Sequence, residues 1–177
     1  MRVISGKYKG KYLEGFDIDG TRPTMDRVKE SMFASIQNYI KESNVLDLFA
    51  GSGSLGIEAL SMGATKCTFV DSGKEVYKIL CKNIKDIDGV NLINLDYSKA
   101  LLQLKNNNVK FDIILLDPPY KMNLINDCIE KIHEYKLLND NGIIVCEYEF
   151  EEIKTEYYKL IKEKKYGSKY VKVYINN

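Results

Sequence analysis

Short apolar runs alternate with segments of helical length from residue 44 onward, and this pattern limits the possible fold more than any other feature of the chain. The apolar runs are 44–49, 67–70, 90–95, 111–116 and 142–147. The segments with a helical pattern are 54–62, 73–86, 98–106 and 123–136. Strands that are apolar along their whole length are typical of a parallel sheet buried on both faces. We therefore expect an α/β fold with a mostly parallel sheet and helices on both faces.

The C-terminal part of the chain departs from this alternation. Residues 159–165 and 169–175 alternate apolar with polar positions and are joined at Gly167-Ser168, which predicts an antiparallel hairpin. The sheet would then have seven strands, with the last one antiparallel. Five strand–helix units closed by a hairpin are typical of the class I, Rossmann-like methyltransferase fold. A dehydrogenase would more usually continue with parallel strands or a second domain.

The N-terminal part predicts a small extension. Residues 2–5 and 11–13 are strand-like and flank a glycine turn, which indicates a β-hairpin. Thr24 is a candidate N-cap for a helix over 25–41. The expected buried face of that helix consists of Val28, Met32, Phe33, Ile36 and Ile40. We therefore divide the chain into a hairpin and loop over 1–24 and a main domain over 25–177 that contains the motifs described below.

The composition excludes several classes of protein. At 177 residues, 45% hydrophobic and 29% charged, the chain reads as one soluble domain. No apolar run approaches the roughly 18 residues of a membrane span, and the first residues lack a signal peptide, so we expect a cytoplasmic protein. The four cysteines form no CxxC pair, and His133 is the single histidine. We therefore expect reduced, buried thiols, no metal site and no histidine-based catalysis.

Positive charge gathers at both ends of the chain. Residues 1–41 hold 8 Lys/Arg against 5 Asp/Glu, residues 154–177 hold 7 against 2, and the middle carries −7 at a total of +1. The N-terminal hairpin alone carries Arg2, Lys7, Lys9 and Lys11, interleaved with tyrosines. Basic arms with aromatic residues suit an RNA backbone and its bases, although lysines that are merely solvated would give the same count.

A glycine-rich loop follows the first apolar run. Gly51, Gly53 and Gly56 form G-x-G-x-x-G between a predicted strand and a helix, and Asp71 ends the next strand, 20 residues after Gly51. Such a loop lets a ligand approach the backbone, and the acid can accept the ribose hydroxyls of an adenosine cofactor. This pairing is shared by dinucleotide sites and S-adenosylmethionine (AdoMet) sites, so alone it leaves both open.

Two further aspartates favour AdoMet. Asp47, just before the loop, would repel a pyrophosphate but attract the ammonium of a methionine moiety. Asp96, at the end of the third strand, lies where such a site would bind the adenine amine, and it can equally be the N-cap of the following helix.

The tetrapeptide Asp117-Pro118-Pro119-Tyr120 follows the fourth predicted strand, where open α/β sheets bind ligands. The prolines fix the backbone and leave rigid carbonyls. If Asp117 and the Pro118 carbonyl each accept an N–H of a base's exocyclic amine, the nitrogen lone pair is aimed at an incoming methyl group. Asp117 can also take the proton, and Tyr120 offers a face for stacking the base.

With these motifs the chain resembles the RsmD-like family of 16S rRNA guanine-N(2) methyltransferases. The resemblance runs from residue 2 to about 175 through RVISGKYKGKYL, RPTMDRVKESMF, LDLFAGSGSLGIEALSMGA, DPPY and YGSKYVKVYI. It implies AdoMet as methyl donor and a guanine of small-subunit rRNA, within a partly assembled particle, as acceptor. It also implies that residues 22–27 lie near the active site. One departure is VDS at Asp71 in place of the more usual VE, which shortens the reach of the carboxylate.

The expected site residues fall into three groups. The catalytic group is Asp117, Pro118, Pro119 and Tyr120. The cofactor group is Asp47, Phe49, Gly51, Gly53, Asp71 and Asp96. The RNA-binding group is Arg2, Lys7, Lys9, Lys11, Arg22, Thr24 and Arg27. We expect a monomer.

Other functions explain fewer of these residues. A DNA adenine-N6 methyltransferase also uses DPPY but generally adds a target-recognition domain, for which 177 residues leave no room. A protein glutamine methyltransferase favours Asn as the first letter of the tetrapeptide. A nucleotide-dependent oxidoreductase explains the glycine loop alone, and a non-catalytic RNA-binding module would need neither motif.

Overall fold

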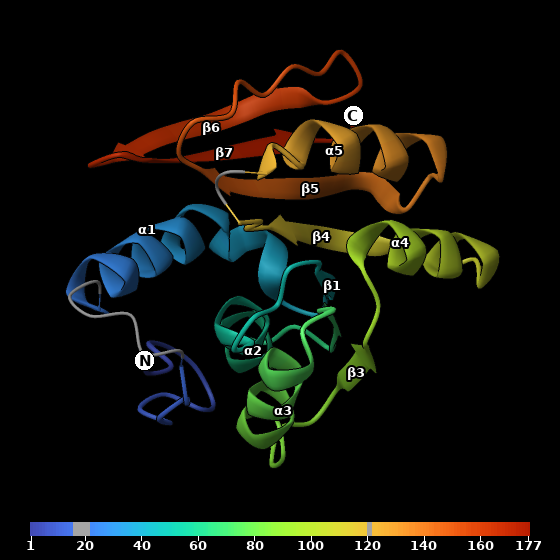
Figure 1. The fold of residues 1–177 in the computed structure, drawn as a ribbon. Coiled ribbons are helices and arrows are strands. Elements are labelled where there is room, and N and C mark those ends of the chain that lie inside the picture. Colours follow the sequence, from blue (N-terminus) through green and yellow to red (C-terminus); the bar gives the residue numbers. More distant parts are fainter. Residues whose placement is uncertain (16–21, 120–121) are drawn as a thin grey trace.

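The computed structural model describes residues 1–15, 22–119 and 122–177, with the side chains of helix α1 described from Asp26 onward. These residues form one seven-stranded sheet with helices on both faces (Figure 1). The strands are β1 (Asn44–Asp47), β2 (Lys66–Val70), β3 (Val90–Ile93), β4 (Phe111–Leu116), β5 (Leu138–Tyr148), β6 (Lys159–Tyr166) and β7 (Lys169–Ile175). The helices are α1 (Arg22–Ile40), α2 (Ser54–Ser61), α3 (Lys74–Asn83), α4 (Tyr97–Asn106) and α5 (Ile125–Glu134).

The sheet has the order β3-β2-β1-β4-β5-β7-β6. Strands β1 to β5 run parallel to one another, whereas β7 pairs antiparallel with both β5 and β6. The prediction of a parallel sheet closed by an antiparallel last strand is therefore confirmed. Because the strands β1 to β5 are parallel, their carboxyl ends share one edge of the sheet.

The apolar strands are buried on both faces, as their sequences predict. One face packs against α1, α2 and α3 through residues such as Val45 and Leu115, and the opposite face packs against α4 and α5 through Leu46 and Leu116. The predicted inward face of α1, from Val28 to Ile40, is buried in the first of these clusters.

Helix α1 begins at Arg22, three residues earlier than the sequence pattern predicts. Thr24 therefore lies inside the first turn, and its assignment as the N-cap is wrong. Pro23 explains the earlier start, because a proline in the first turn of a helix loses no hydrogen bond and has the required φ.

The N-terminal segment is less regular than a β-hairpin. It pairs only through the antiparallel bridge between Arg2 and Tyr12, with hydrogen bonds such as Val3 N–H to the Lys11 carbonyl (3.0 Å). Gly6, at φ +78°, turns the chain directly onto the end of α2, where an added Cβ would lie 1.8 Å from the Ser61 carbonyl oxygen. This contact, rather than a strand ladder, fixes the segment.

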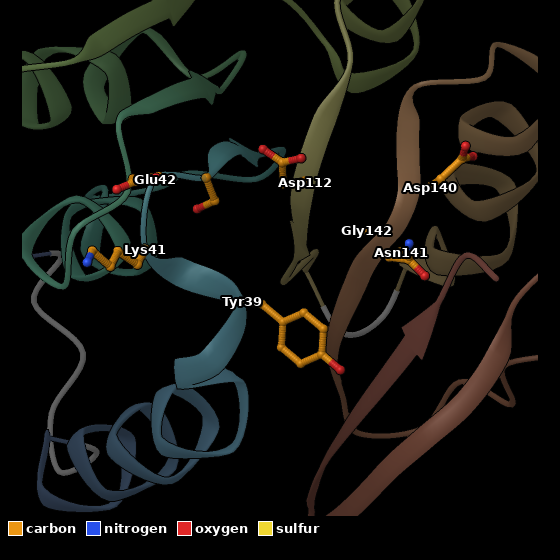
Figure 2. A pocket seen from close by; sticks show the side chains of 8 residues that line it. Tyr39, Lys41, Glu42, Asp112, Asp140, Asn141 and Gly142 are labelled. Carbon is orange, nitrogen blue, oxygen red and sulfur yellow. The ribbon is translucent and has the colours of Figure 1, made fainter.

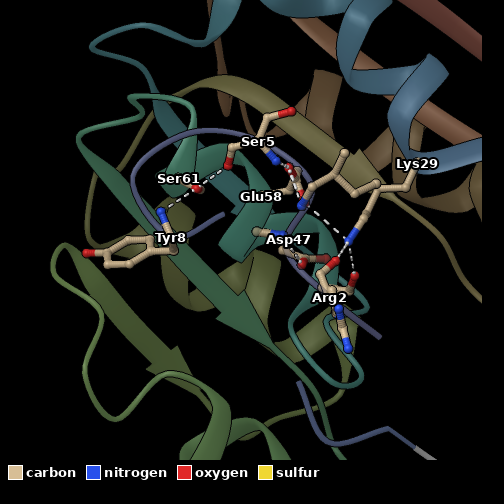
Figure 3. A network of polar contacts seen from close by, with 10 residues as sticks. Arg2, Ser5, Tyr8, Lys29, Asp47, Glu58 and Ser61 are labelled. Atoms are coloured by element: carbon tan, nitrogen blue, oxygen red, sulfur yellow. Dashed lines mark hydrogen bonds and ion pairs between the residues drawn. The ribbon is translucent and has the colours of Figure 1, made fainter. Parts of the chain in front are cut away.

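A buried ion pair joins this segment to two helices (Figure 3). The Glu58 carboxylate accepts the N–H groups of Ile4 and Ser5 at 2.8–3.1 Å and lies 3.2 Å from the Lys29 ammonium. Lys29 also donates to the Arg2 carbonyl (2.8 Å) and to Ser54 Oγ (3.0 Å). Lys29 and Glu58 are only 5% and 1% exposed, so the first residues, α1 and the start of α2 are held together in the interior.

The cysteines are free thiols, as the sequence predicts, and the single histidine lies on a helix surface. Cys67, Cys128 and Cys146 are buried and Cys81 is partly buried, all as free thiols. His133 lies exposed on α5 and stacks on Tyr157 with ring centres 3.9 Å apart. Among the described residues, none of the helices is long and apolar enough to cross a membrane.

Candidate active site

The predicted catalytic and cofactor residues gather at the carboxyl edge of the sheet. Asp47 ends β1, Asp71 directly follows β2, and Asp117 directly follows β4. The glycine loop leads from β1 into α2 at the same edge. Open α/β sheets bind their ligands in this position.

The first and third glycines of the loop have different roles. Gly51, at φ +54°, has nothing within 4 Å of the position of an added Cβ, so its outer side is open to a ligand. Gly56 lies in α2, and a Cβ there would be 2.3 Å from Phe69 Cε1. The first glycine thus provides access to the backbone, and the third lets α2 pack closely on β2.

Asp47 is buried beneath this loop. It is 1% exposed, and its Oδ2 accepts the Gly56 N–H at 2.9 Å. Burial raises the pKa of Asp47 to about 7, and the neighbouring Asp71 carboxylate adds to the rise. A cation bound beside Asp47 would favour its ionised form.

Asp71 fixes the backbone of the loop. Its Oδ2 accepts the Gly51 N–H at 3.0 Å and its Oδ1 accepts the Gly73 N–H at 2.9 Å. Each carboxylate oxygen has a further lone pair, so Asp71 can still accept the two hydroxyls of a ribose. The shorter side chain, compared with glutamate, therefore leaves the proposed ribose contact possible.

Asp96 is the N-cap of α4. Its Oδ1 accepts the N–H groups of Ser98 (3.1 Å) and Lys99 (3.2 Å), and these bonds lower the pKa of Asp96. The capping role considered from the sequence is confirmed, whereas contact with an adenine amine stays a prediction. Phe49 lies nearby, with its ring centre 5.6 Å from that of Tyr97, so an aromatic wall borders this part of the edge.

The tetrapeptide begins as the sequence predicts, at the end of β4. Pro118 is buried, Pro119 is exposed, and the Pro119 carbonyl accepts the Met122 N–H at 3.1 Å. Burial raises the pKa of Asp117 well above its ordinary value, and the nearby Glu147 and Asp47 carboxylates act in the same direction. Tyr120 lies outside the described residues.

Sequence reasoning missed two charged residues beside Asp117. Glu147 and Lys169 form an ion pair of 2.8 Å on β5 and β7, and the Lys169 ammonium opposes the rise in the pKa of Asp117. The signal in the sequence is a charge at the end of the apolar run GIIVCE, at the same strand edge as Asp117.

The structure separates the predicted RNA-binding residues into two groups. Arg22, Thr24 and Arg27 belong to the start of α1, which lies at the carboxyl edge because the helix runs from there toward the start of β1. The side chains of Arg22 and Thr24 are outside the described part, and Arg27 is exposed. The backbone of Arg2 lies near the start of α2, because the Lys29 ammonium donates both to the Arg2 carbonyl and to Ser54 Oγ of that helix.

The lysines of the N-terminal turn point elsewhere. Lys7 pairs with Asp88 at 3.0 Å, and the preceding turn packs on Ser61 at the end of α2, toward the amino edge of the sheet. Lys9 is exposed and Lys11 partly so. The basic turn is therefore remote from Asp117, and its contact with RNA stays a prediction.

A cavity of about 300 Å³ opens at the opposite, amino edge of the sheet (Figure 2). Its lining residues are Tyr39, Lys41, Glu42, Ser43, Asp112, Asp140, Asn141 and Gly142. None of these is a predicted site residue. Asp112 already accepts hydrogen bonds from the Asn44 N–H and the Asn139 Nδ2–H, both at 2.8 Å, and so ties strands together.

The carboxyl edge fits AdoMet better than a dinucleotide. The open side of Gly51 lies beside Asp71, and the buried Asp47 lies below the loop. Two carboxylates this close to the loop would repel a pyrophosphate, whereas they suit a cofactor with an ammonium and a sulfonium.

Comparison with known proteins is consistent with this geometry. A family model described as "Conserved hypothetical protein 95" matches residues 1–175. Ribosomal RNA small subunit methyltransferase D of Haemophilus influenzae is 38% identical over 185 residues, which cover 99% of this chain and 94% of that protein. The chain belongs to this family, known as the RsmD family.

Other members of the RsmD family give the same result. Ribosomal RNA small subunit methyltransferase D of Escherichia coli is 34% identical over 151 residues, covering 85% of this chain and 76% of that protein. A solved structure described as "Putative methyltransferase yhhF from Escherichia coli" has a TM-score of 0.88 at 30% identity and covers 100% of this chain and 98% of its own. This RsmD-family chain is therefore an enzyme, a methyltransferase with the class I fold, as its sequence predicts.

Proposed function

We propose that this chain transfers a methyl group from AdoMet to the exocyclic N2 amine of a guanine in 16S ribosomal RNA. The observation that carries the proposal is the position of Asp117 and Pro118 at the carboxyl end of β4, at the same edge as the glycine loop. The relatives named for small-subunit ribosomal RNA support the acceptor.

AdoMet, when bound, supplies an electrophilic methyl group on a sulfonium sulfur. The chain would hold it with the backbone of Gly51 and Gly53, with Asp71 toward the ribose, Asp47 toward the ammonium and Asp96 toward the adenine. The buried Asp47 carboxylate would attract the cofactor's ammonium electrostatically from beneath the loop. This attraction is stronger when Asp47 is ionised.

Asp117 and the Pro118 carbonyl position the acceptor. The guanine amine is a weak nucleophile because its lone pair is delocalised into the ring. Two acceptors that each bind one N–H draw the nitrogen toward tetrahedral geometry and aim its lone pair, so most of the acceleration comes from orientation. The proton that leaves the nitrogen passes to Asp117.

A DNA adenine-N6 methyltransferase is not favoured. The tetrapeptide fits both reactions, but the family match spans residues 1–175 and includes the N-terminal segment and α1 as well as the catalytic core. The curated relatives at 34–38% identity carry the name of a ribosomal RNA enzyme.

The substrate is a 16S rRNA or a small-subunit assembly particle, and the protein acts as a monomer in the cytoplasm. Arg27, exposed near the start of α1, and Lys164 and Lys165, exposed near the end of β6, provide positive charge next to the catalytic edge. These cationic groups would contact phosphates and make binding depend on salt.

The function is tested by mapping the methylated nucleoside. The protein is incubated with labelled AdoMet and small-subunit particles from a strain that lacks this methylation, and the RNA is digested and analysed by mass spectrometry. We expect one labelled N2-methylguanosine in 16S rRNA. Label in adenine, in DNA or in protein would contradict the proposal.

Replacing Asp71 by alanine should weaken AdoMet binding by about tenfold or more, because a charge-assisted hydrogen bond to the ribose and the anchor of Gly51 are both lost. Isothermal calorimetry measures the affinity, with NAD as a ligand that should not bind to either protein. Unchanged AdoMet affinity would remove Asp71 from the cofactor site.

Replacing Tyr120 by alanine should chiefly weaken use of the RNA, because stacking on the base contributes about 1–3 kcal/mol. The Tyr120→Phe variant keeps the ring and should be mildly affected. Steady-state kinetics with the particle as varied substrate separates the two variants. Equal losses in both would show that the hydroxyl group matters rather than the ring.

A further inference from the structure

The ion pair between Glu147 and Lys169 has no part in the mechanism described so far. The Lys169 ammonium lies 2.8 Å from Glu147 Oε1, and the two side chains are only 20% and 8% exposed. Removing two charges from water is costly, and a buried pair gives little net stability compared with apolar residues. A pair of this kind next to a reacting carboxylate is a candidate for a functional role.

Strand register places this pair beside Asp117. Leu116 pairs with Cys146 across the parallel strands β4 and β5, so Asp117 and Glu147 follow at the same level. Glu147 pairs with Val171 of the antiparallel strand β7, and Lys169 lies two residues earlier on the same face of that strand. The side chains of Glu147 and Lys169 therefore meet diagonally across β5 and β7, at the carboxyl edge.

The position of Lys169 is fixed from both sides. Lys169 is the first residue of β7 and pairs with Tyr166 at the end of β6. The Tyr166 hydroxyl is hydrogen-bonded to the Ser31 hydroxyl of α1. The hairpin tip is thus tied to the helix whose start borders the catalytic edge, and the ammonium is held where the tip closes on β5.

Among the residues that the structure describes, three charged groups act on Asp117 from the strands around it. Asp47 acts from β1, Glu147 from β5 and Lys169 from β7. The two carboxylates raise the pKa of Asp117 and the ammonium lowers it. Lys169 is thus the one cation of this set, and Glu147 lies in contact with it.

We propose that Glu147 and Lys169 are positioning residues for Asp117: the Lys169 ammonium favours, against the effect of burial, the carboxylate form of Asp117 that accepts the guanine amine, and Glu147 anchors this ammonium and limits its effect. The role in the reaction rests on the proposed function, since it assumes that Asp117 must be ionised to accept the amine hydrogens. The direction of each charge effect on Asp117 does not depend on that assumption.

The test is the pH at which Asp117 becomes protonated in four proteins. These are the wild type, Lys169→Gln, Glu147→Gln and the double variant. Lys169→Gln removes a charge that favours the ionised form of Asp117, so the acid limb of its single-turnover rate should shift upward by about one pH unit. Glu147→Gln removes a charge that repels the Asp117 carboxylate, so the acid limb of this variant should shift to lower pH. The double variant should lie between them.

A second readout measures the protonation of Asp117 independently of the methylation reaction. The ¹³C carboxyl resonance of Asp117, assigned by its absence in Asp117→Asn, is followed by NMR as a function of pH. The matched control is Glu163→Gln, which breaks the Lys172–Glu163 pair of 3.4 Å on the same hairpin. In this variant the acid limb of the rate and the NMR titration midpoint of Asp117 should both stay at their wild-type pH values. The Lys169→Arg variant should restore the wild-type limb if charge is what matters.

Different outcomes contradict the role of the Glu147–Lys169 pair and the proposed guanine methylation. Shifts in the same direction for Lys169→Gln and Glu147→Gln, or shifts no larger than that of Glu163→Gln, overturn the inference. If wild type methylates no guanine while the NMR titrations still shift in opposite directions, the proposed function fails and the effect of the pair on Asp117 stands. If Lys169→Gln does not fold, the protonation of Asp117 in the double variant and in Lys169→Arg is compared with that in Glu147→Gln instead.

Discussion

Replacement of Asp117 by alanine should lower the single-turnover rate of guanine methylation by about 100-fold or more, because the amine loses both its charged acceptor and the group that takes its proton. Asp117 follows the last residue of β4 directly, and its burial with Glu147 and Asp47 nearby raises its pKa. A carboxylate with a raised pKa is a better proton acceptor than an ordinary aspartate.

The same replacement should leave AdoMet affinity nearly unchanged, since Asp117 is assigned to the acceptor and not to the cofactor. Calorimetry on the variant therefore provides the control for the kinetic experiment. The Asp117→Asn variant keeps the size of the side chain and should also be slow, because it is uncharged. Normal turnover in either variant would show that Asp117 has no role in the reaction.

Replacement of Lys29 by methionine should have the largest effect on stability. Glu58 is 1% exposed and would keep its charge in the interior, where its remaining partners among the described residues are the N–H groups of Ile4 and Ser5. Breaking a buried ion pair in this way should lower the free energy of unfolding by about 3 kcal/mol. For a chain of this length the melting temperature should then fall by about 10 °C.

Two further variants show whether the buried charge is the cause. Lys7→Met breaks the Lys7–Asp88 pair, whose side chains are 65% and 89% exposed, and should change the melting temperature little. Adding Glu58→Gln to Lys29→Met removes the uncompensated charge and should recover part of the loss. A Lys29→Met protein as stable as Lys7→Met would contradict the structural role of the network in Figure 3.

The sequence predicts the sheet well because its strands are buried on both faces. Runs such as FDIILL at β4 have no polar alternation, and their length excludes helices. The start of β5 was missed because Leu138–Asn141 are mostly polar, and this part of the strand depends on backbone pairing of Asn141 with Asn176 near the C-terminus. That contact cannot be seen from a local pattern.

The site is predictable where each residue lies next to a strand end. Asp47, Asp71 and Asp117 each end or follow a parallel strand, so the fold alone brings them to one edge. The Glu147–Lys169 pair was not predicted, because it depends on the register of β7 against β5 and on residues 22 positions apart. The position of the N-terminal lysines was not predictable, since it depends on Gly6, which turns the chain toward the amino edge.

The central claim is that AdoMet lies over the glycine loop with its methyl group directed at Asp117. A crystal structure with bound S-adenosylhomocysteine tests it most directly. We predict that the ribose contacts Asp71, that the amino acid part lies over Gly51 and Gly53, and that the sulfur faces Asp117 across an open space wide enough for a base. A ligand bound in the cavity of Figure 2, or a sulfur that faces away from Asp117, would contradict the account.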